Sequence, residues 1–357
     1  MPRCLERRGI AMGGKRICCP PSKGPDPSTL GSRALTLGVV NAEVAASPAR
    51  LLRPRGADGA GAGDHQGTPD NAKHPYAGEL LFYVPDEIDP RFSDPGAWFT
   101  CTGTLVDPTH VVTAGHCTYA VGRGGQSTTA GGGTGSGGTD VWISFAEVPD
   151  FDILPPSSDF APDGNADRYA AWSTALDGSE EWVRATSFPH PQFDPDAFCL
   201  HDMGVLELSE PVHMSTYGAL PSQGLIDKLY QADRNATYTA VGYGLEESSK
   251  FTAVGGDNRR DATVKINNLQ GVYGTGKGIA VGWSSNNGKP HQGGTCFGDS
   301  GGPTFPTGDA DSCNDNVVLT VTSFGIDENC AAGGGGYRLD QPDDLAFLSM
   351  FGLTPSP

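Results

Sequence analysis

The chain has 357 residues and is rich in glycine (51) and proline (28), which is enough for one large or two ordinary domains and favours short strands and turns over long helices. Its formal net charge of -18 at pH 7 repels nucleic acid, so we expect no nucleic-acid partner. No stretch approaches the roughly 20 apolar residues of a membrane-spanning helix, so we expect no membrane insertion.

The charge is divided unevenly along the chain. Residues 1–63 carry a net charge of +6, whereas residues 64–357 carry -24. The basic leader contains a short apolar run at 34–40 followed by small residues, which loosely resembles an export signal and its cleavage zone. Three interpretations stay open, namely a cleaved export signal, a disordered basic leader, and a start codon assigned too far upstream. Residues 53–72 have the composition of a linker, so we place the folded domain at 64–357.

Apolar segments bounded by turn residues predict a series of short strands in the first half of the domain. The expected strands are 80–84, 98–106, 109–113, 141–145, 182–188 and 204–208. The Gly-rich stretch 122–138 interrupts them and predicts a flexible surface loop. It lacks the G-K-[ST] ending of a phosphate-binding loop.

The second half continues the same pattern. The expected strands are 238–241, 264–266, 279–283, 317–324 and 336–339. Short strands at irregular, turn-punctuated spacing predict an all-β barrel or sandwich. One helix is expected, at the C-terminal end, with Asp340 as its cap and Pro342 in its first turn. Its apolar face comprises Leu345, Phe347, Leu348 and Phe351.

The chain has nine cysteines, three of them in the leader. The other six are Cys101, Cys117, Cys199, Cys296, Cys313 and Cys330. Their number alone assigns no pairing, but an even count fits an oxidising compartment. The absence of a C-x-x-C pair argues against zinc sites and thioredoxin-like sites.

The run Gly298-Asp299-Ser300-Gly301-Gly302-Pro303 is the first candidate for chemistry. A serine hydroxyl needs an adjacent base to act as a nucleophile. Flanking glycines let the backbone bend sharply, so that the amides of Gly298 and Ser300 can point at one developing oxyanion. The nucleophile elbow of α/β-hydrolases has a similar sequence, but in that fold the catalytic histidine follows the serine along the chain. The last histidine here is His291, so the base must lie upstream of Ser300.

Two upstream segments can supply the remaining groups. His116 ends an apolar strand in Thr113-Ala114-Gly115-His116-Cys117, and Cys101 lies 16 residues before Cys117, so a hairpin can bring the two sulfurs together. Asp202 opens the apolar strand 204–208, which is too apolar to be an exposed loop. A carboxylate in such a place can hold a histidine in the correct tautomer.

These three runs, in this order, resemble the active-site motifs of the trypsin/chymotrypsin family of serine proteases. The resemblance covers roughly residues 67–352. It implies two six-stranded antiparallel β-barrels, at roughly 74–215 and 236–340, followed by a C-terminal helix. The catalytic groups then lie in the cleft between the barrels.

The resemblance assigns roles by matched position. His116 is the general base, Asp202 orients it, Ser300 attacks, and the amides of Gly298 and Ser300 form the oxyanion hole. Cys101–Cys117 and Cys296–Cys330 match two family disulfides, whereas Cys199 and Cys313 have no family counterpart and can pair with each other. The expected substrate-binding residues are Gly294, Thr295, Ser323, Phe324, Gly325 and Gly335.

Specificity follows from the matched floor of the substrate pocket, which is Gly294. Trypsin-like members carry an aspartate there, so cleavage after Arg or Lys is not expected. Together with Thr295, Gly325 and Gly335, this glycine predicts an open, uncharged pocket that suits an apolar or aromatic side chain.

Three features depart from the family. An insertion between His116 and Asp202, which includes the Gly-rich loop, is expected at the surface of the first barrel. The start aligned with the family's freed N-terminus reads 64–67 without an isoleucine, which leaves the partner of Asp299 open. Asn235-Ala236-Thr237 fits a glycosylation acceptor.

The sequence therefore predicts a secreted, monomeric serine endopeptidase that acts on protein or peptide substrates through an acyl-enzyme. That chemistry requires no metal and no cofactor. A catalytically silent homologue that acts as a binding protein and an esterase with the same triad remain as alternatives.

Overall fold

The structure is a computed structural model of the whole chain. It describes residues 10–12, 15–17 and 42–43, and then 67–355 apart from 85–96, 120, 122–136, 162–163, 198–199, 249–252, 257, 271–276, 285–292, 308–315, 327–329 and 332. The leader apart from its three short segments, most of the Gly-rich loop, Cys199 and Cys313 lie outside the described residues. Short strands β1 (Ile10–Met12) and β2 (Lys15–Ile17) pair with each other.

The first barrel is a closed ring of six antiparallel strands within the described residues. Its strands are β5 (Ala77–Val84), β6 (Ala97–Leu105), β7 (His110–Thr113), β8 (Val141–Ser144), β9 (Val183–Pro189) and β10 (Gly204–Leu208). The order β6-β5-β8-β9-β10-β7 closes through a β6–β7 pairing. Strand β3 (Ala42–Glu43) adds to the outside of β6.

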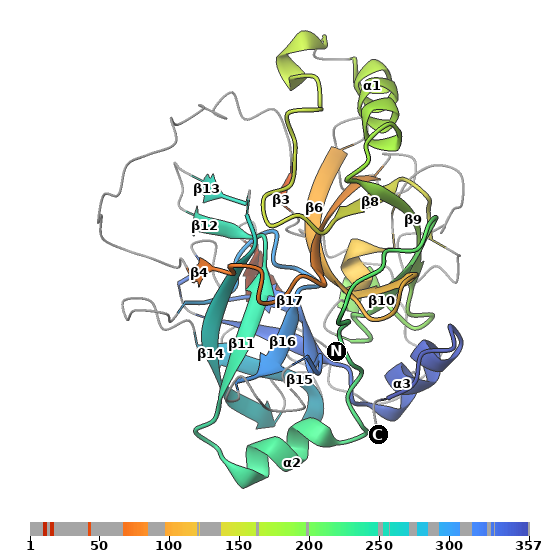
Figure 1. Cartoon of the computed structure of the whole chain (residues 1–357). Helices are drawn as coiled ribbons and strands as arrows, with labels where there is room; N and C mark the ends of the chain where they lie inside the picture. The colour runs from red at the N-terminus through yellow and green to blue at the C-terminus, as the bar shows by residue number, and fades with distance from the viewer. Residues whose placement is uncertain are drawn as a thin grey trace, which may run out of the picture.

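The second barrel repeats this arrangement. Its strands are β11 (Thr237–Gly242), β14 (Arg260–Gln270), β15 (Lys277–Ser284), β16 (Pro303–Pro306), β17 (Thr320–Gly325) and β18 (Gly334–Arg338). They follow the order β11-β16-β17-β18-β15-β14 and close through a β11–β14 pairing. Strand β4 (Thr68–Pro69) joins β14, while β12 (Leu245–Ser248) and β13 (Ala253–Gly255) form a separate hairpin. Figure 1 shows the two barrels side by side, which confirms the predicted fold class.

Strand β5 is buried along its whole length, and both of its faces are covered. Leu80 and Phe82 point into the barrel interior, whereas Leu81 and Tyr83 belong to a second apolar cluster on the outer face. Helix α1 (Asn165–Asp177) covers that outer face with Trp172 and Leu176. The insertion therefore adds a layer over the outside of the first barrel, which explains why β5 ends in a continuous apolar run at 80–84.

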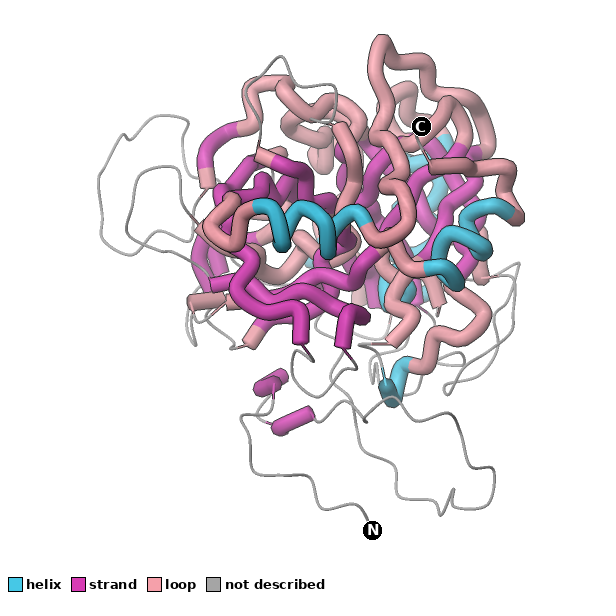
Figure 2. Tube along the Cα trace, turned by 90° about the horizontal axis from the view of Figure 1, so that it is seen from below, coloured by secondary structure: helices cyan, strands magenta, loops and turns pink. Residues whose placement is uncertain are grey.

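Two further helices lie on the outside of the barrels (Figure 2). Helix α2 (Leu225–Ala232) buries Ile226 against the second barrel. Helix α3 (Pro342–Ser349) begins at the predicted proline and packs on the first barrel. The ring of Phe351, just after the helix, contacts the ring of Phe347 and also the ring of Phe188 on β9, with the Phe351 and Phe188 ring centroids 5.3 Å apart. None of the helices among the described residues has both the length and the apolar character needed to cross a membrane.

The prediction that Asp340 caps α3 is wrong, because the N-cap position is Gln341 and makes no side-chain capping bond. Asp340 instead accepts hydrogen bonds from the backbone N–H of Ile226 at 2.9 Å and from the guanidinium of Arg338 at 2.8 Å. It therefore fixes the start of α2 against the end of β18. The expectation of a single helix is also wrong, since the described residues contain three α-helices.

A buried arginine joins the two barrels. Arg259 precedes β14 of the second barrel and donates to the carbonyl oxygens of Ala77 and Phe145 in the first barrel, both at 3.1 Å. Its Nε lies 2.9 Å from Asp70 Oδ2, and His74 Nδ1 meets the other oxygen of Asp70 at 2.5 Å. Arg259 and Asp70 are both almost fully buried, so this pair fixes how the barrels face each other.

We expect the stabilisation from Asp70 to disappear in acid. Burial alone would raise the pKa of Asp70, but hydrogen bonds from His74 and Arg259 outweigh it and lower that pKa from 3.8 to about 2. The unfolded chain therefore binds more protons than the folded chain between these values. The Asp70 carboxylate therefore contributes about 2 kcal/mol to the free energy of unfolding above about pH 4, and this contribution is lost as the pH falls through 2.

Urea unfolding of the wild type and Asp70→Asn at pH 6 and at pH 2.5 measures this effect. The difference in unfolding free energy between the two proteins should shrink at the lower pH. A difference that is the same at both values would contradict the pairing.

Candidate active site

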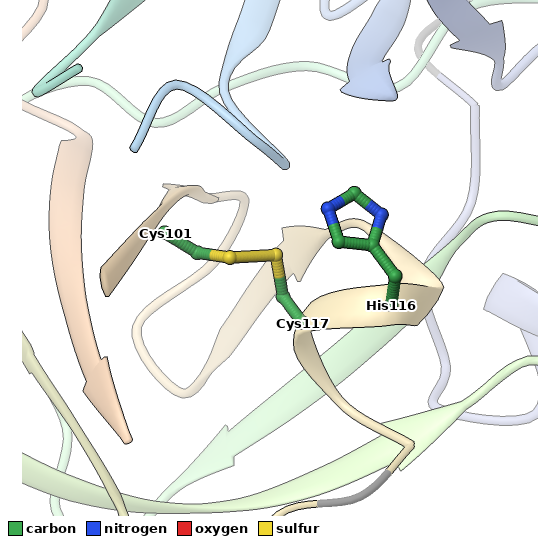
Figure 3. Close-up of side chains that lie close together, drawn as sticks. All are labelled: Cys101, His116 and Cys117. Carbon is green, nitrogen blue, oxygen red and sulfur yellow. A yellow bond between two sulfur atoms is a disulfide. The ribbon is translucent and has the colours of Figure 1, made fainter. Parts of the chain in front are cut away.

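The short 3-10 turn η1 (Gly115–Cys117) begins two residues after the end of β7 and carries His116. The side chain of Cys117 forms a disulfide with Cys101 on β6, as expected. Figure 3 shows this disulfide beside the His116 ring. His116 is 5% exposed. Because both sulfurs are bonded to each other, they are not available to a metal ion at this position.

Asp202 receives three donors from two barrels. Its carboxylate accepts the backbone N–H of His116 at 2.9 Å and lies 2.9 and 3.0 Å from His116 Nδ1. The hydroxyl of Ser323, on β17, donates to Oδ2 at 2.5 Å. Asp202 is completely buried, so a charge on its carboxylate depends on these donors. With Nδ1–H held by the carboxylate, His116 carries its basic lone pair on Nε2.

Ser300 lies on a tight turn between Gly298 and Gly301. Both glycines have positive φ values, 98° and 78°, in the region that favours glycine. Thr102, on β6 of the first barrel, fixes this turn: its N–H donates to the Ser300 carbonyl at 2.7 Å and its hydroxyl donates to the Gly298 carbonyl at 2.9 Å. Thr113, three residues before His116, donates in turn to the Thr102 carbonyl at 2.8 Å. The segments that carry Ser300 and His116 are thereby linked through one strand.

The backbone amides of this turn fall into two groups. Those of Asp299, Gly301 and Gly302 each donate to a backbone carbonyl oxygen. Those of Gly298 and Ser300 have no acceptor within the described part of the chain. Two unpaired donors on one turn are what an oxyanion site requires.

Asp299 has backbone partners in place of an amine. Its two carboxylate oxygens accept the N–H groups of Gly244 at 2.9 Å and Cys296 at 2.8 Å. A Cβ at Gly242 or Gly244 would collide with this carboxylate, which explains both glycines. Loss of solvation raises the pKa of Asp299 to about 6, although these hydrogen bonds favour the charged form. The turn before Ser300 is therefore tied to the second barrel by its own carboxylate.

The expected substrate-binding residues lie in three segments of the chain, and their surroundings differ. Gly294 and Thr295 line a cavity of about 30 Å³ together with Asp299. Ser323 contacts Asp202. Phe324 is 3% exposed, and its ring tip would lie 2.2 Å from a Cβ built at Gly335. The space that Gly335 leaves is thus taken up by the Phe324 ring.

Two contacts were not predicted from the sequence. Thr102 was not singled out, and no motif marks it, because its role depends on the register of β6 against the turn of a different barrel. Ser323 was expected to bind substrate, and its hydrogen bond to Asp202 was not foreseen. The Cys296–Cys330 disulfide is present as expected and anchors the start of the Ser300 turn.

Comparisons with known proteins concern the family and the fold of the chain. The trypsin family model matches residues 166–339, a range that contains Asp202 and Ser300 and begins after His116. The solved structure of HL collagenase is similar in fold, with 17% sequence identity and a TM-score of 0.50, and the alignment covers 79% of this chain and 95% of that chain. None of the curated proteins compared with the chain matches it. Residues 166–339 therefore match the trypsin family, and the described residues form a fold of two six-stranded barrels that is similar to that of HL collagenase.

Proposed function

We propose that the protein is a serine endopeptidase that hydrolyses peptide bonds through an acyl-enzyme. In this proposal Ser300 attacks the carbonyl carbon, His116 takes the serine proton at Nε2, and Asp202 holds the imidazole through Nδ1. The observation that carries the proposal is the buried contact between Asp202 and His116 Nδ1, at 2.9 Å. A buried carboxylate in this position fixes the tautomer that leaves Nε2 basic and stabilises the imidazolium that forms.

The same geometry supports the later steps. The tetrahedral intermediate carries its charge on the former carbonyl oxygen, and the unpaired amides of Gly298 and Ser300 can donate to it. His116 then returns the proton to the leaving amine, and a water molecule repeats the sequence to release the acid. Each step uses groups of the chain and water alone.

The pocket residues support an uncharged specificity site. Gly294 offers no carboxylate to a basic side chain, and Phe324 contributes an aromatic wall over Gly335. We infer a preference for small apolar side chains before the cleaved bond, because the ring occupies the room that a large side chain would need.

The proposed setting is outside the cell, with the protein acting as a monomer on protein or peptide substrates. The disulfides Cys101–Cys117 and Cys296–Cys330 support an oxidising compartment. The basic leader, 1–63, is proposed as a segment separate from the protease domain at 64–357.

A fluorophosphonate probe tests the nucleophile directly, since it labels only activated serines. We expect the wild type to be labelled and Ser300→Ala to remain unlabelled, and we expect the wild type to cleave a peptide library. Labelling of both proteins would assign the reactivity to another serine. Labelling of neither would favour the silent homologue, and cleavage of activated esters without peptides would favour the esterase. Dominant cleavage after Arg or Lys would contradict the uncharged pocket.

A further inference from the structure

Three side chains of a second polar cluster come together behind the Asp202 segment. His190 directly follows β9, His201 directly precedes Asp202, and Asp344 lies in the first turn of α3. One nitrogen or oxygen atom of each side chain lies within 4.8 Å of the other two. The rings of His190 and His201 stack with their centroids 4.9 Å apart and their planes at 10°.

The cluster contains buried polar atoms that lack partners. Asp344 is completely buried and His190 is 4% exposed. The Oδ1 atom of Asp344 accepts the hydroxyl of Tyr337 at 3.1 Å, but its Oδ2 atom has no hydrogen-bond partner among the described residues. The same is true of His201 Nδ1, which lies 3.3 Å from Asp343 Oδ2 without forming a hydrogen bond. Buried polar groups in proteins are normally satisfied, so this arrangement points to a missing partner.

The donor set matches a particular class of ion. Two imidazole nitrogens and one carboxylate oxygen form a three-ligand set that binds Zn²⁺, with water as the fourth ligand. Hard cations such as Mg²⁺ and Ca²⁺ prefer oxygen ligands throughout. Tetrahedral zinc places its donors about 3.4 Å apart, so donors that already lie within 4.8 Å need only side-chain rotation.

We propose that His190, His201 and Asp344 form a binding site for one Zn²⁺ ion or a similar divalent transition metal. The ion would join α3 to the segment that carries Asp202. That segment is short and stiff: His190 N–H donates to the Met203 carbonyl and Met203 N–H donates to the His201 carbonyl, both at 2.8 Å. The site is distinct from the proposed triad, and its existence does not depend on the peptidase proposal.

Zinc binding by the full chain tests this site. Free thiols are alkylated first so that zinc on cysteine is not counted, and bound metal is removed with EDTA and dialysis. The variants are His201→Asn and Asp344→Asn. Asparagine suits position 201, where φ is 54°. The control is His213→Asn, because His213 is exposed.

In equilibrium dialysis, the wild type and His213→Asn should each bind about one more zinc ion per chain than His201→Asn and Asp344→Asn. Zinc in large excess should raise the melting temperature of the first pair by about 5 °C and leave the second pair unchanged. Equal binding by all four proteins, or no binding by the wild type, would overturn the site.

Cobalt provides a readout that does not depend on how the variants fold. Co²⁺ in a tetrahedral nitrogen and oxygen site absorbs visible light far more strongly than hydrated Co²⁺. The wild type should show this band, and added Zn²⁺ should remove it. Wild-type spectra that match free Co²⁺ would contradict the proposed coordination.

Discussion

The Asp202→Asn enzyme should lose about 10⁴-fold in kcat at neutral pH, with little change in KM. In the wild type, one carboxylate accepts His116 N–H, His116 Nδ1–H and the Ser323 hydroxyl together. The carboxamide of the asparagine variant has only one oxygen acceptor, and its NH₂ group must face either the imidazole or the Ser323 hydroxyl. The ring then carries its proton on Nε2, where it cannot take the proton of Ser300.

Steady-state hydrolysis of a peptide identified by the library digest measures this loss. Asp233→Asn is a matched control, because Asp233 is an exposed aspartate at the end of α2, and it should retain full activity. Circular dichroism establishes that both variants are folded. A kcat for Asp202→Asn within tenfold of the wild type would remove Asp202 from its proposed role.

Gly301→Ala should destabilise the protein by about 4 kcal/mol. The φ of Gly301 is 78°, and this left-handed backbone costs a residue with a Cβ about 1–2 kcal/mol. A Cβ there would also lie 2.0 Å from Thr113 Oγ1, 2.4 Å from the Thr102 carbonyl oxygen and 2.8 Å from Ala114 N. Two of these atoms are backbone and cannot rotate away, so the turn itself must move, with an overpacking cost of about 1–3 kcal/mol.

Gly224→Ala separates the two contributions. Gly224 has a φ of 70°, but a Cβ there would meet nothing within 4 Å. It should therefore lose only the backbone term, about 1–2 kcal/mol, in urea unfolding. Gly301→Ala should lose more than Gly224→Ala and should also label slowly with the fluorophosphonate, because the displaced turn carries Ser300. Equal losses in the two variants would contradict the steric argument.

Most strands could be predicted from the sequence because their apolar residues are contiguous and end at turn residues. Among the barrel strands the exception is β16, which has only four residues and carries Pro303 and Pro306 at its two ends. The missed helices did leave a signal. Tyr169, Trp172 and Leu176 in α1 follow helical spacing, as do Leu225 and Leu229 in α2.

The candidate site divides in the same way. Each of His116, Asp202 and Ser300 lies in a short sequence motif, so each could be proposed from the local sequence alone. The contacts of Thr102 and Ser323 depend on which strand of one barrel faces which turn of the other barrel. Those distances in sequence are long, for example 196 residues between Thr102 and Gly298, and no local pattern encodes them.

The division of the proposed catalytic groups between barrels has a consequence for biosynthesis. A ribosome releases His116 and Asp202 long before Ser300, and α3, which packs back on the first barrel, emerges later still. A nascent chain that ends before Ser300 therefore carries His116 and Asp202 without the proposed nucleophile, and α3 is not yet available to pack on its first barrel. If the proposed triad is correct, an unfinished chain that ends before Ser300 has no proteolytic activity of its own.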